Sequence, residues 1–380
     1  MIAKEFFTDI ENHFKSQLPF VGYRKPNDTF VKAILQQDNT IHTVNDFTET
    51  GFVFSPFDSN KDTILFPLQH SITISCSAIL PSEIFNIKNL ECKTKTYNAS
   101  EKEHEQHLKL VEKGIKAIND GRFEKVVLSR VEELPISEEN PIEIFKSVLK
   151  TYPTAFVYLW YHPEIGLWLG ATPETLLKIE GQRFKTMSLA GTKKYDSSIE
   201  KPWGTKETNE QQIVTDFIVN SLEDFVSDIN VTPPKTVKAG ELLHLESKIS
   251  GVLKSGGIKP VVKTLHPTPA ICGLPKTEAK NFILNNENYN RAFYTGFLGE
   301  LNVKTSKSRN TNRRNVENNA YSSIRTTSEL FVNLRCMQIK NKQALVYVGG
   351  GITQGSDPEL EWEETVSKTK TMMRVLVNHI

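Results

Sequence analysis

The stretch from residue 155 to residue 191, AFVYLWYHPEIGLWLGATPETLLKIEGQRFKTMSLAG, decides the fold class. It holds successive runs rich in β-branched and aromatic residues, separated by turn residues at His162-Pro163 and at Gly181. Strands that follow one another, without a regular alternation of strand and helix, are typical of proteins built on antiparallel sheets. We therefore expect an α+β architecture with mostly antiparallel sheets.

Further elements are predicted on both sides of this stretch. Upstream, residues 29–80 alternate short runs such as TFVKAILQ and GFVFSPF with turn residues, which predicts a meander of strands. Downstream, β patterns return at residues 235–252 and in ALVYVGGG. Apolar residues at helical spacing predict helices at residues 1–18, 101–120, 206–226 and 357–378, and one more that opens at Asn140-Pro141.

The composition is that of an ordinary globular protein. The 380 residues include 46 Lys and Arg against 45 Asp and Glu, and 38% are hydrophobic, enough for a large core. No apolar run approaches the roughly 18–20 residues that span a bilayer, and the amphipathic N-terminus is unlike a signal peptide. We expect a cytoplasmic protein with no membrane partner. The cysteines, at positions 76, 92, 272 and 336, form no CxxC pair, so neither a disulfide framework nor a zinc site is indicated.

One segment stands apart in composition. Residues 303–326, VKTSKSRNTNRRNVENNAYSSIRT, contain six Lys or Arg, one Glu and five Asn, with almost no apolar periodicity. This composition predicts an extended solvated loop. A contact with an anion or a nucleic acid is the alternative, but the near-zero net charge of the chain gives no general attraction to nucleic acid, and none is expected as a partner.

Two acidic pairs have helical i, i+3 spacing. Glu207 and Glu210 lie in KETNEQQ, and Glu361 and Glu364 lie in ELEWEET. The spacing puts both carboxylates of a pair on one helix face, and four such groups facing one another could hold Mg²⁺, which prefers oxygen ligands. In a chain with 45 acidic residues such pairs also arise by chance on solvated surfaces.

Several other residues could serve chemistry or structure. Gly349 to Gly351 permit a ligand to approach the backbone closely, or form a tight turn from strand to helix. Lys125, at the start of KVVLSR, is either a surface lysine or an inward-facing one suited to a general base. His244 and His266 could be core histidines. Arg335 lies in the apolar run LFVNLRCMQI, where an inward-pointing arginine needs an anion such as a ligand carboxylate.

Taken together, these segments resemble the chorismate-utilising enzyme family, and most closely its isochorismate synthases. The resemblance runs from about Phe123 to the C-terminus and breaks at the basic segment, while residues 1–95 match only loosely. The family fold implies a single large α+β domain over residues 1–380, with two mostly antiparallel sheets packed together and helices outside. The blocks that carry the resemblance are FEKVVLSR, LGATPETLL, LAGT, the Glu207/Glu210 pair, LLHL, LHPTPAICGLP, RAFYTGFLGE, LRC, GGGI and EWEET.

The resemblance also implies roles for individual residues. Lys125 would be the general base that activates water, and Glu174 the general acid that protonates the departing hydroxyl. The four glutamates would form the Mg²⁺ site. Arg335, the Gly349 to Gly351 backbone and Lys368 would hold substrate carboxylates, and His244 and His266 would line the ring pocket. The remaining substrate-binding residues implied by the resemblance are Ala190, Gly191, Thr192, Thr268 and Tyr294.

Two positions favour an isochorismate synthase over close relatives. Ala190 stands where aminodeoxychorismate synthases carry a lysine nucleophile, and Lys125 stands where anthranilate synthases typically carry glutamine. The expected reaction is the Mg²⁺-dependent conversion of chorismate to isochorismate, which would feed menaquinone or a catecholate siderophore. The sequence does not fix the oligomeric state, and a monomer is favoured. A salicylate synthase, which shares the lysine base, is the alternative enzyme; an inactive relative that binds a partner through the basic loop is the alternative outside catalysis.

Overall fold

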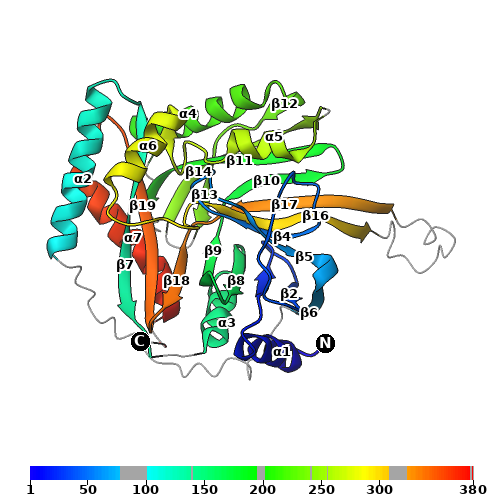
Figure 1. Cartoon of the computed structure of the whole chain (residues 1–380). Coiled ribbons are helices and arrows are strands. Elements are labelled where there is room, and N and C mark those ends of the chain that lie inside the picture. The colour runs from blue at the N-terminus through cyan, green and yellow to red at the C-terminus, as the bar shows by residue number, and fades with distance from the viewer. Residues whose placement is uncertain are drawn as a thin grey trace.

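The computed structural model describes residues 1–77, 101–137, 140–194, 202–239, 242–254, 256–307, 323–376 and 379. Within these residues two large sheets carry the fold (Figure 1). The first sheet has nine strands. Their spatial order is β15 (Gly273–Leu274), β7 (Lys125–Pro135), β19 (Gln343–Ile352), β18 (Cys336–Lys340), β9 (Gly166–Thr172), β8 (Phe156–His162), β1 (Phe20–Arg24), β2 (Phe30–Gln36) and β6 (Ser71–Ser77).

The second sheet has ten strands. Every pairing among the described strands of both sheets is antiparallel, as the central stretch predicted. The spatial order of the second sheet is β12 (Val226–Val231), β14 (Leu242–Leu253), β11 (Arg183–Lys194), β10 (Thr175–Glu180), β17 (Ser323–Val332), β16 (Phe297–Lys307), β4 (Gly51–Ser55), β5 (Ile64–Pro67) and β3 (His42–Thr43), with β13 (Lys235–Ala239) beside β14.

Aromatic side chains hold the two sheets face to face. Phe156 of the first sheet stacks on Phe331 of the second with ring centroids 4.2 Å apart, and Trp160 stacks on Phe66 at 5.1 Å. All four side chains are buried. Large aromatic groups bury 150–250 Å² each and favour offset or edge contacts, so this layer contributes much of the hydrophobic stabilisation between the sheets.

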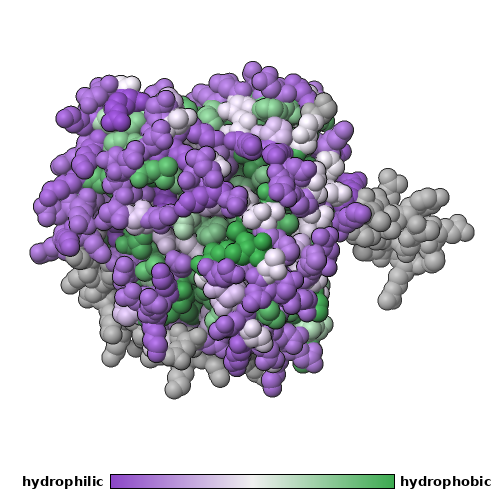
Figure 2. All heavy atoms as spheres, in the orientation of Figure 1, coloured by the Kyte–Doolittle hydropathy of each residue, from purple (hydrophilic) through white to green (hydrophobic). Residues whose placement is uncertain are grey.

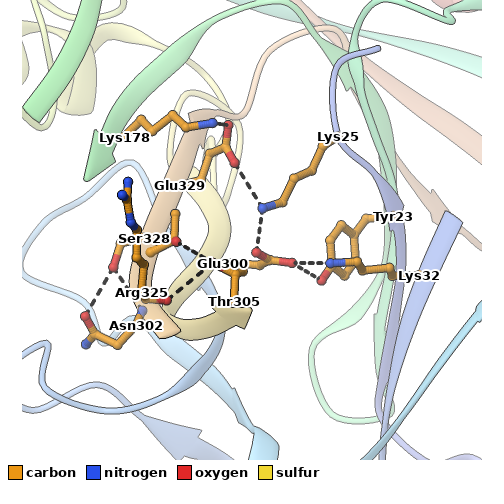
Figure 3. A network of polar contacts seen from close by, with 11 residues as sticks. Tyr23, Lys25, Lys32, Lys178, Glu300, Asn302, Thr305, Arg325, Ser328 and Glu329 are labelled. Carbon is orange, nitrogen blue, oxygen red and sulfur yellow. Dashed lines mark hydrogen bonds and ion pairs between the residues drawn. The ribbon is translucent and has the colours of Figure 1, made fainter. Parts of the chain in front are cut away.

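A polar network also joins the sheets (Figure 3). Glu300 of β16, 2% exposed, accepts hydrogen bonds from Tyr23 of β1 and from Lys25, both at 2.5 Å. Lys25 lies 3.0 Å from Glu329 of β17, which also pairs with Lys178 of β10. Removing one partner would leave a buried charge unpaired, so the network fixes how the N-terminal strands sit on the second sheet.

Helices cover the outer faces. α1 (Ala3–Lys15), α3 (Pro141–Thr151) and α7 (Pro358–Leu376) contribute to the apolar cluster on the first sheet, and α4 (Thr205–Leu222) and α5 (Ile258–Leu265) to that on the second. α2 (Glu101–Asn119) and α6 (Lys276–Asn286) pack beside β7, and the short 3₁₀ helix η1 covers Leu68–His70. None of the described helices is long and apolar enough to cross a membrane.

Two expectations about elements need correction. Residues 29–80 do not form one meander, because β2 and β6 join the first sheet while β3, β4 and β5 join the second. The predicted loop 303–326 is strand at both ends, since β16 runs to Lys307 and β17 begins at Ser323; residues 308–322 lie outside the described part. Polar strands paired only with each other lack apolar alternation, which explains why the pattern missed them.

Candidate active site

A pocket opens where the two sheets meet at the ends of β7, β11 and β19. It encloses about 110 Å³. On the face shown in Figure 2, hydrophilic residues cover most of the molecule and apolar ones gather near the middle. The pocket is lined by Val127, Pro173, Glu174, Leu189, Ala190, Gly191, Thr192, Glu210, His244, Ala270, Ile271, Tyr294, Thr295, Leu334, Arg335, Tyr347, Val348, Gly349, Gly350, Gly351, Glu364, Lys368, Thr371 and Met372.

Lys125 lies just behind this lining. It is the first residue of β7, fully buried, and its Nζ lies 2.7 Å from Oε1 of Glu210 on α4. The Glu210 carboxylate is therefore the partner of this buried amine. The inward orientation considered for Lys125 is confirmed. A buried amine beside a pocket suits proton transfer.

Glu174 lies in the pocket on the turn between β9 and β10. Its side chain is 4% exposed, and burial raises its pKa from an ordinary value of 4.5 to about 8, although the positive charges of Lys125 and Arg335 act in the opposite direction. The carboxyl group therefore keeps its proton at neutral pH. A protonated carboxyl facing a pocket is chemically able to donate a proton.

Arg335 is held in place by His244. Its Nη2 donates to Nε2 of His244 at 2.8 Å, and the other ring nitrogen, Nδ1, lies 3.0 Å from the carbonyl oxygen of Gly191. A carbonyl can only accept and a guanidinium can only donate, so Nδ1 carries the proton and the ring is neutral. Burial, with the nearby charges of Arg335 and Lys368, lowers the pKa of His244 to about 3 and keeps it neutral.

The setting of Arg335 differs from the expected one. It does not lie within a strand but between β17 and β18, which belong to different sheets, and its φ of 47° is in the left-handed region. The apolar run in the sequence is therefore two strands joined at a crossing point. The crossing brings the guanidinium to the pocket, where burial lowers its pKa to about 10 and leaves it charged at neutral pH.

The triple glycine is the end of β19 and not a turn. Its partners on β7 are Ser129, Leu128 and Val127. Successive side chains of a strand point to opposite faces, so Gly349 and Gly351 leave one face of β19 bare and Gly350 leaves the other face bare. A Cβ on Gly351 would lie 2.5 Å from Oε1 of Glu210 and 3.0 Å from Cε of Lys125. Because these glycines have no side chains, side chains of other elements can approach this backbone closely from both faces.

The carboxylates of α7 approach from the face of Gly350. A Cβ on Gly350 would lie 3.3 Å from Oε2 of Glu361 and 3.6 Å from Oε1 of Glu364, so the two carboxylates converge on one point. Glu364 also pairs with Lys368 at 2.6 Å, and Lys368 donates to the carbonyl oxygen of Gly349 at 2.8 Å. Glu207, in contrast, turns its carboxylate towards the start of its own helix.

The donor chemistry fits a hard divalent cation, although the described residues contain no group of three or more His, Cys, Asp or Glu side chains close enough to hold a metal ion by themselves. Mg²⁺ is usually held by one or two carboxylates, with waters and substrate oxygens completing its shell. Glu361 and Glu364 provide two converging carboxylates beside an open pocket. Their oxygens are therefore the ones placed to hold such an ion.

The structure brings most of the predicted residues to the pocket. Ala190, Gly191, Thr192 and Tyr294 line it, together with Glu174, Arg335 and the triple glycine. His266 and Thr268 do not. Nε2 of His266 lies 3.2 Å from the carbonyl oxygen of Pro56 and its ring packs edge-on against Phe297, so it is a core histidine, the alternative that its sequence left open.

The residues that the sequence reasoning missed are mostly apolar. Ala270 and Ile271 line the pocket in place of His266 and Thr268, which belong to the same block, LHPTPAICGLP. Val127, Thr295 and Tyr347 line it as well. The alternation of side chains along β7 could have predicted Val127. It lies two residues after Lys125 and therefore on the same face of the strand.

Comparison with known proteins now places the chain. The family model described as chorismate binding enzyme matches residues 73–307 and 321–377. The chain belongs to this family. The match begins before Phe123, where the sequence blocks began, and it is interrupted inside the basic segment 303–326, as expected of an insertion.

Individual family members share about a quarter of their residues with the chain. Isochorismate synthase DhbC of Bacillus subtilis (strain 168) is 28% identical over 300 residues, which cover 73% of this chain and 69% of that protein. Isochorismate synthase MenF of Pasteurella multocida (strain Pm70) is 28% identical over 282 residues, which cover 70% of this chain. The chain spans only 60% of that relative's length.

Solved structures confirm the predicted fold. DhbC of Bacillus anthracis superposes with a TM-score of 0.74 at 21% identity, covering 98% of this chain and 99% of that chain. MenF of Escherichia coli gives 0.71 at 22% identity, covering 94% and 88%. Anthranilate synthase component I of Streptococcus pneumoniae TIGR4 gives 0.62 at 17% identity, covering 94% and 92%. These proteins with different names thus share one fold with this chain.

Proposed function

We propose that the protein is a Mg²⁺-dependent isochorismate synthase, an isomerase that moves the hydroxyl group of chorismate from ring carbon 4 to ring carbon 2. The observation that carries the proposal is the pairing of two buried proton-transfer groups of opposite character at one pocket. Lys125 is a fully buried amine held beside Glu210, and Glu174 is a carboxyl group that burial keeps protonated, with a pKa of about 8. A hydroxyl exchange needs a base for water and an acid for the leaving group.

The proposed reaction assigns one proton to each of these groups. Water adds to ring carbon 2 while the hydroxyl at ring carbon 4 leaves and the double bonds between these carbons shift. Lys125 takes a proton from the attacking water, and Glu174 gives a proton to the departing hydroxyl, which leaves as water. No redox partner is needed, because substrate and product are isomers. Ala190 at the pocket wall offers no amine to compete with water as the nucleophile.

Cationic groups would hold the two carboxylates of chorismate. Arg335 presents a charged guanidinium that His244 keeps oriented, and Lys368 also lines the pocket, where it contacts Glu364 and the Gly349 carbonyl. The pocket of about 110 Å³ is smaller than the roughly 300–1,000 Å³ of typical ligand sites. Entry of the substrate would therefore displace the flexible Lys368 side chain from these partners.

Glu361 and Glu364 are the residues that would hold Mg²⁺. Of the two α4 glutamates that were predicted with them, Glu210 pairs with Lys125 and Glu207 turns its carboxylate towards the start of α4. The ion would offset the negative charge of a substrate carboxylate and help to orient it. The names of the relatives MenF and DhbC suggest two pathways that the product could feed, namely the synthesis of menaquinone or of a catecholate siderophore. The chain itself offers no feature that selects one of them.

The test is incubation of the purified protein with chorismate and Mg²⁺, with and without EDTA, followed by chromatographic identification of the products. A mixture of chorismate and isochorismate that forms only without EDTA is the expected result. Salicylate with pyruvate would assign the salicylate synthase reaction instead. Absence of any conversion by a correctly folded protein would refute the proposal.

A further inference from the structure

Among the described strands, none pairs with the full length of the outer edge of β7. The two-residue strand β15 pairs only with Lys125 and Val126, while β7 continues to Pro135. An edge strand has unpaired N–H and C=O groups that must find other partners when they are buried. Two of these groups, the C=O of Val127 and the N–H of Ser129, are met by side chains from a single short segment, residues 287–291.

Arg291 is the donor in this arrangement. Its side chain is 3% exposed, and each of its five N–H groups has an acceptor. Nη2 donates to the carbonyl oxygen of Val127 at 2.7 Å, Nη1 donates to the carbonyl oxygen of Ile271 at 3.1 Å, and Nη1 also donates to Oγ1 of Thr295 at 3.3 Å. The remaining two groups bind Glu287 at 2.5 and 2.8 Å.

Glu287 is the acceptor. Its Oε1 receives the backbone N–H of Ser129 at 2.8 Å and the hydroxyl of Ser129 at 2.7 Å. The Ser129 hydroxyl also lies 2.7 Å from the Tyr289 hydroxyl, which closes the network. Arg291 and Glu287 thus offer β7 one hydrogen-bond donor and one acceptor. A neighbouring antiparallel strand would offer its backbone N–H and C=O groups at the same spacing.

We propose that Arg291 and Glu287 are positioning residues that replace a missing strand beside β7 and so fix Lys125 and the pocket wall. This rests on the proposed function for the meaning of Lys125. Neither residue lines the pocket, but all three non-acidic acceptors of Arg291, on Val127, Ile271 and Thr295, belong to residues that do. One guanidinium therefore ties three separate segments of the wall together.

The geometry explains why arginine and glutamate are needed. A planar guanidinium can direct parallel N–H groups at a carboxylate while its other N–H groups reach backbone carbonyls, whereas an ammonium group has three donors and no fixed plane. In Arg291→Lys the charge of Glu287 would stay balanced, but some of the wall contacts would be lost. In Glu287→Gln the overall shape is kept, but an amide hydrogen atom faces either Ser129 or the guanidinium.

The experiment compares Arg291→Lys and Glu287→Gln with Arg24→Lys. Arg24 is a matched control: it is 5% exposed and donates to the carbonyl oxygens of Leu149 and Tyr152 at the end of α3, on the far strands of the first sheet. Three quantities are measured for each full-length variant, namely the melting temperature, kcat and KM for chorismate, and the hydrogen exchange rate of the residue 126–130 amides without substrate.

For both changes at the pair we expect faster exchange of the Ser129 amide and a fall in kcat of about 100-fold, the usual cost of displacing a reacting group by about 1 Å. KM should stay within about threefold, because the groups proposed to hold the carboxylates are untouched. Arg24→Lys should lower the melting temperature by a similar amount without affecting kcat or exchange in β7.

Equal kcat values in the variants and the control, or unchanged exchange of the Ser129 amide, would overturn the proposal. If Arg291→Lys does not fold, the isosteric Glu287→Gln decides by the same criteria. A wild-type protein that fails to convert chorismate would refute the proposed function. Hydrogen exchange is measured without turnover, so the exchange rates would still support or overturn the positioning role of Arg291 and Glu287 on β7.

Discussion

Replacing the proposed general acid by its amide, Glu174→Gln, should separate activity from stability. Glu174 is buried and keeps its proton to a pKa of about 8. Glutamine has a similar shape but no acidic proton, so turnover of chorismate should fall by about 10²- to 10⁴-fold, the usual contribution of a general acid. The same change should make the folded protein more stable at neutral and alkaline pH.

The stability change follows from proton linkage. The unfolded chain releases the Glu174 proton near pH 4.5 and the folded protein near pH 8, so wild-type stability falls as the pH rises between these values. Each pH unit in this window costs about 1.4 kcal/mol. The variant avoids this cost, and its advantage should be near zero below pH 4.5, up to about 3 kcal/mol at pH 7, and constant above pH 8.

Two assays test the prediction. Thermal unfolding of both proteins from pH 5 to pH 9 should show a melting-temperature difference that grows with pH, by about 4 °C at pH 7 for a chain of this size. The wild-type rate should fall with rising pH, because the protonated fraction of Glu174 drops from about nine tenths at pH 7 to about one tenth at pH 9.

A melting-temperature difference that does not depend on pH would show that Glu174 is ionised in the folded protein, which would refute its assignment as the acid. Near-normal turnover in a folded Glu174→Gln protein would refute it independently.

Three further substitutions have sharp expectations. Lys125→Met should lose about 10²- to 10⁴-fold in kcat while its circular dichroism spectrum stays native, and a loss below about tenfold would exclude Lys125 as the base. Glu364→Gln should raise the Mg²⁺ concentration needed for half-maximal activity, whereas exposed Glu363→Gln should not; equal Mg²⁺ titrations would remove Glu364 from the proposed metal site. Gly351→Ala should abolish turnover because its Cβ would collide with Glu210, while Gly355→Ala, with no atom within 4 Å, should be silent; similar kinetics in the two alanine variants would contradict the close approach.

The sequence predicted most of what depends on local pattern. The strand pattern left Lys125 either at the surface or inward, and the structure shows it inward. Asn140 was correctly expected to begin a helix, where its side chain accepts from the Ile142 N–H at 3.0 Å. Both signals need only a few neighbouring residues. The fold class followed in the same way, because closely spaced strands with turn residues leave few ways to pair.

Contacts between distant segments could not be predicted. Arg335 was expected inside a strand, but the apolar run around it crosses from one sheet to the other, and nothing in its composition marks the crossing. The crossing is evident only in the structure, where the side chain of Asn333 binds the Phe293 carbonyl and the Tyr158 hydroxyl. The family resemblance likewise implied His266 in the pocket wall where the structure has Ala270, although a ring pocket needs apolar walls.

The triple glycine of β19 allows groups on the two faces of this strand to come close to its backbone. Glycine in a strand interior costs roughly 0.5–1 kcal/mol relative to alanine, so three in succession weaken β19 by about 2 kcal/mol. The structure shows what requires them: Gly349 and Gly351 face Tyr294 and Lys125, while Gly350 faces the carboxylates of α7. Any side chain on either face would hold those groups away from the backbone. The strand therefore acts as a thin wall that Lys125 and Glu210 approach from one side and the α7 carboxylates from the other, and its sequence is set by this access and not by strand stability.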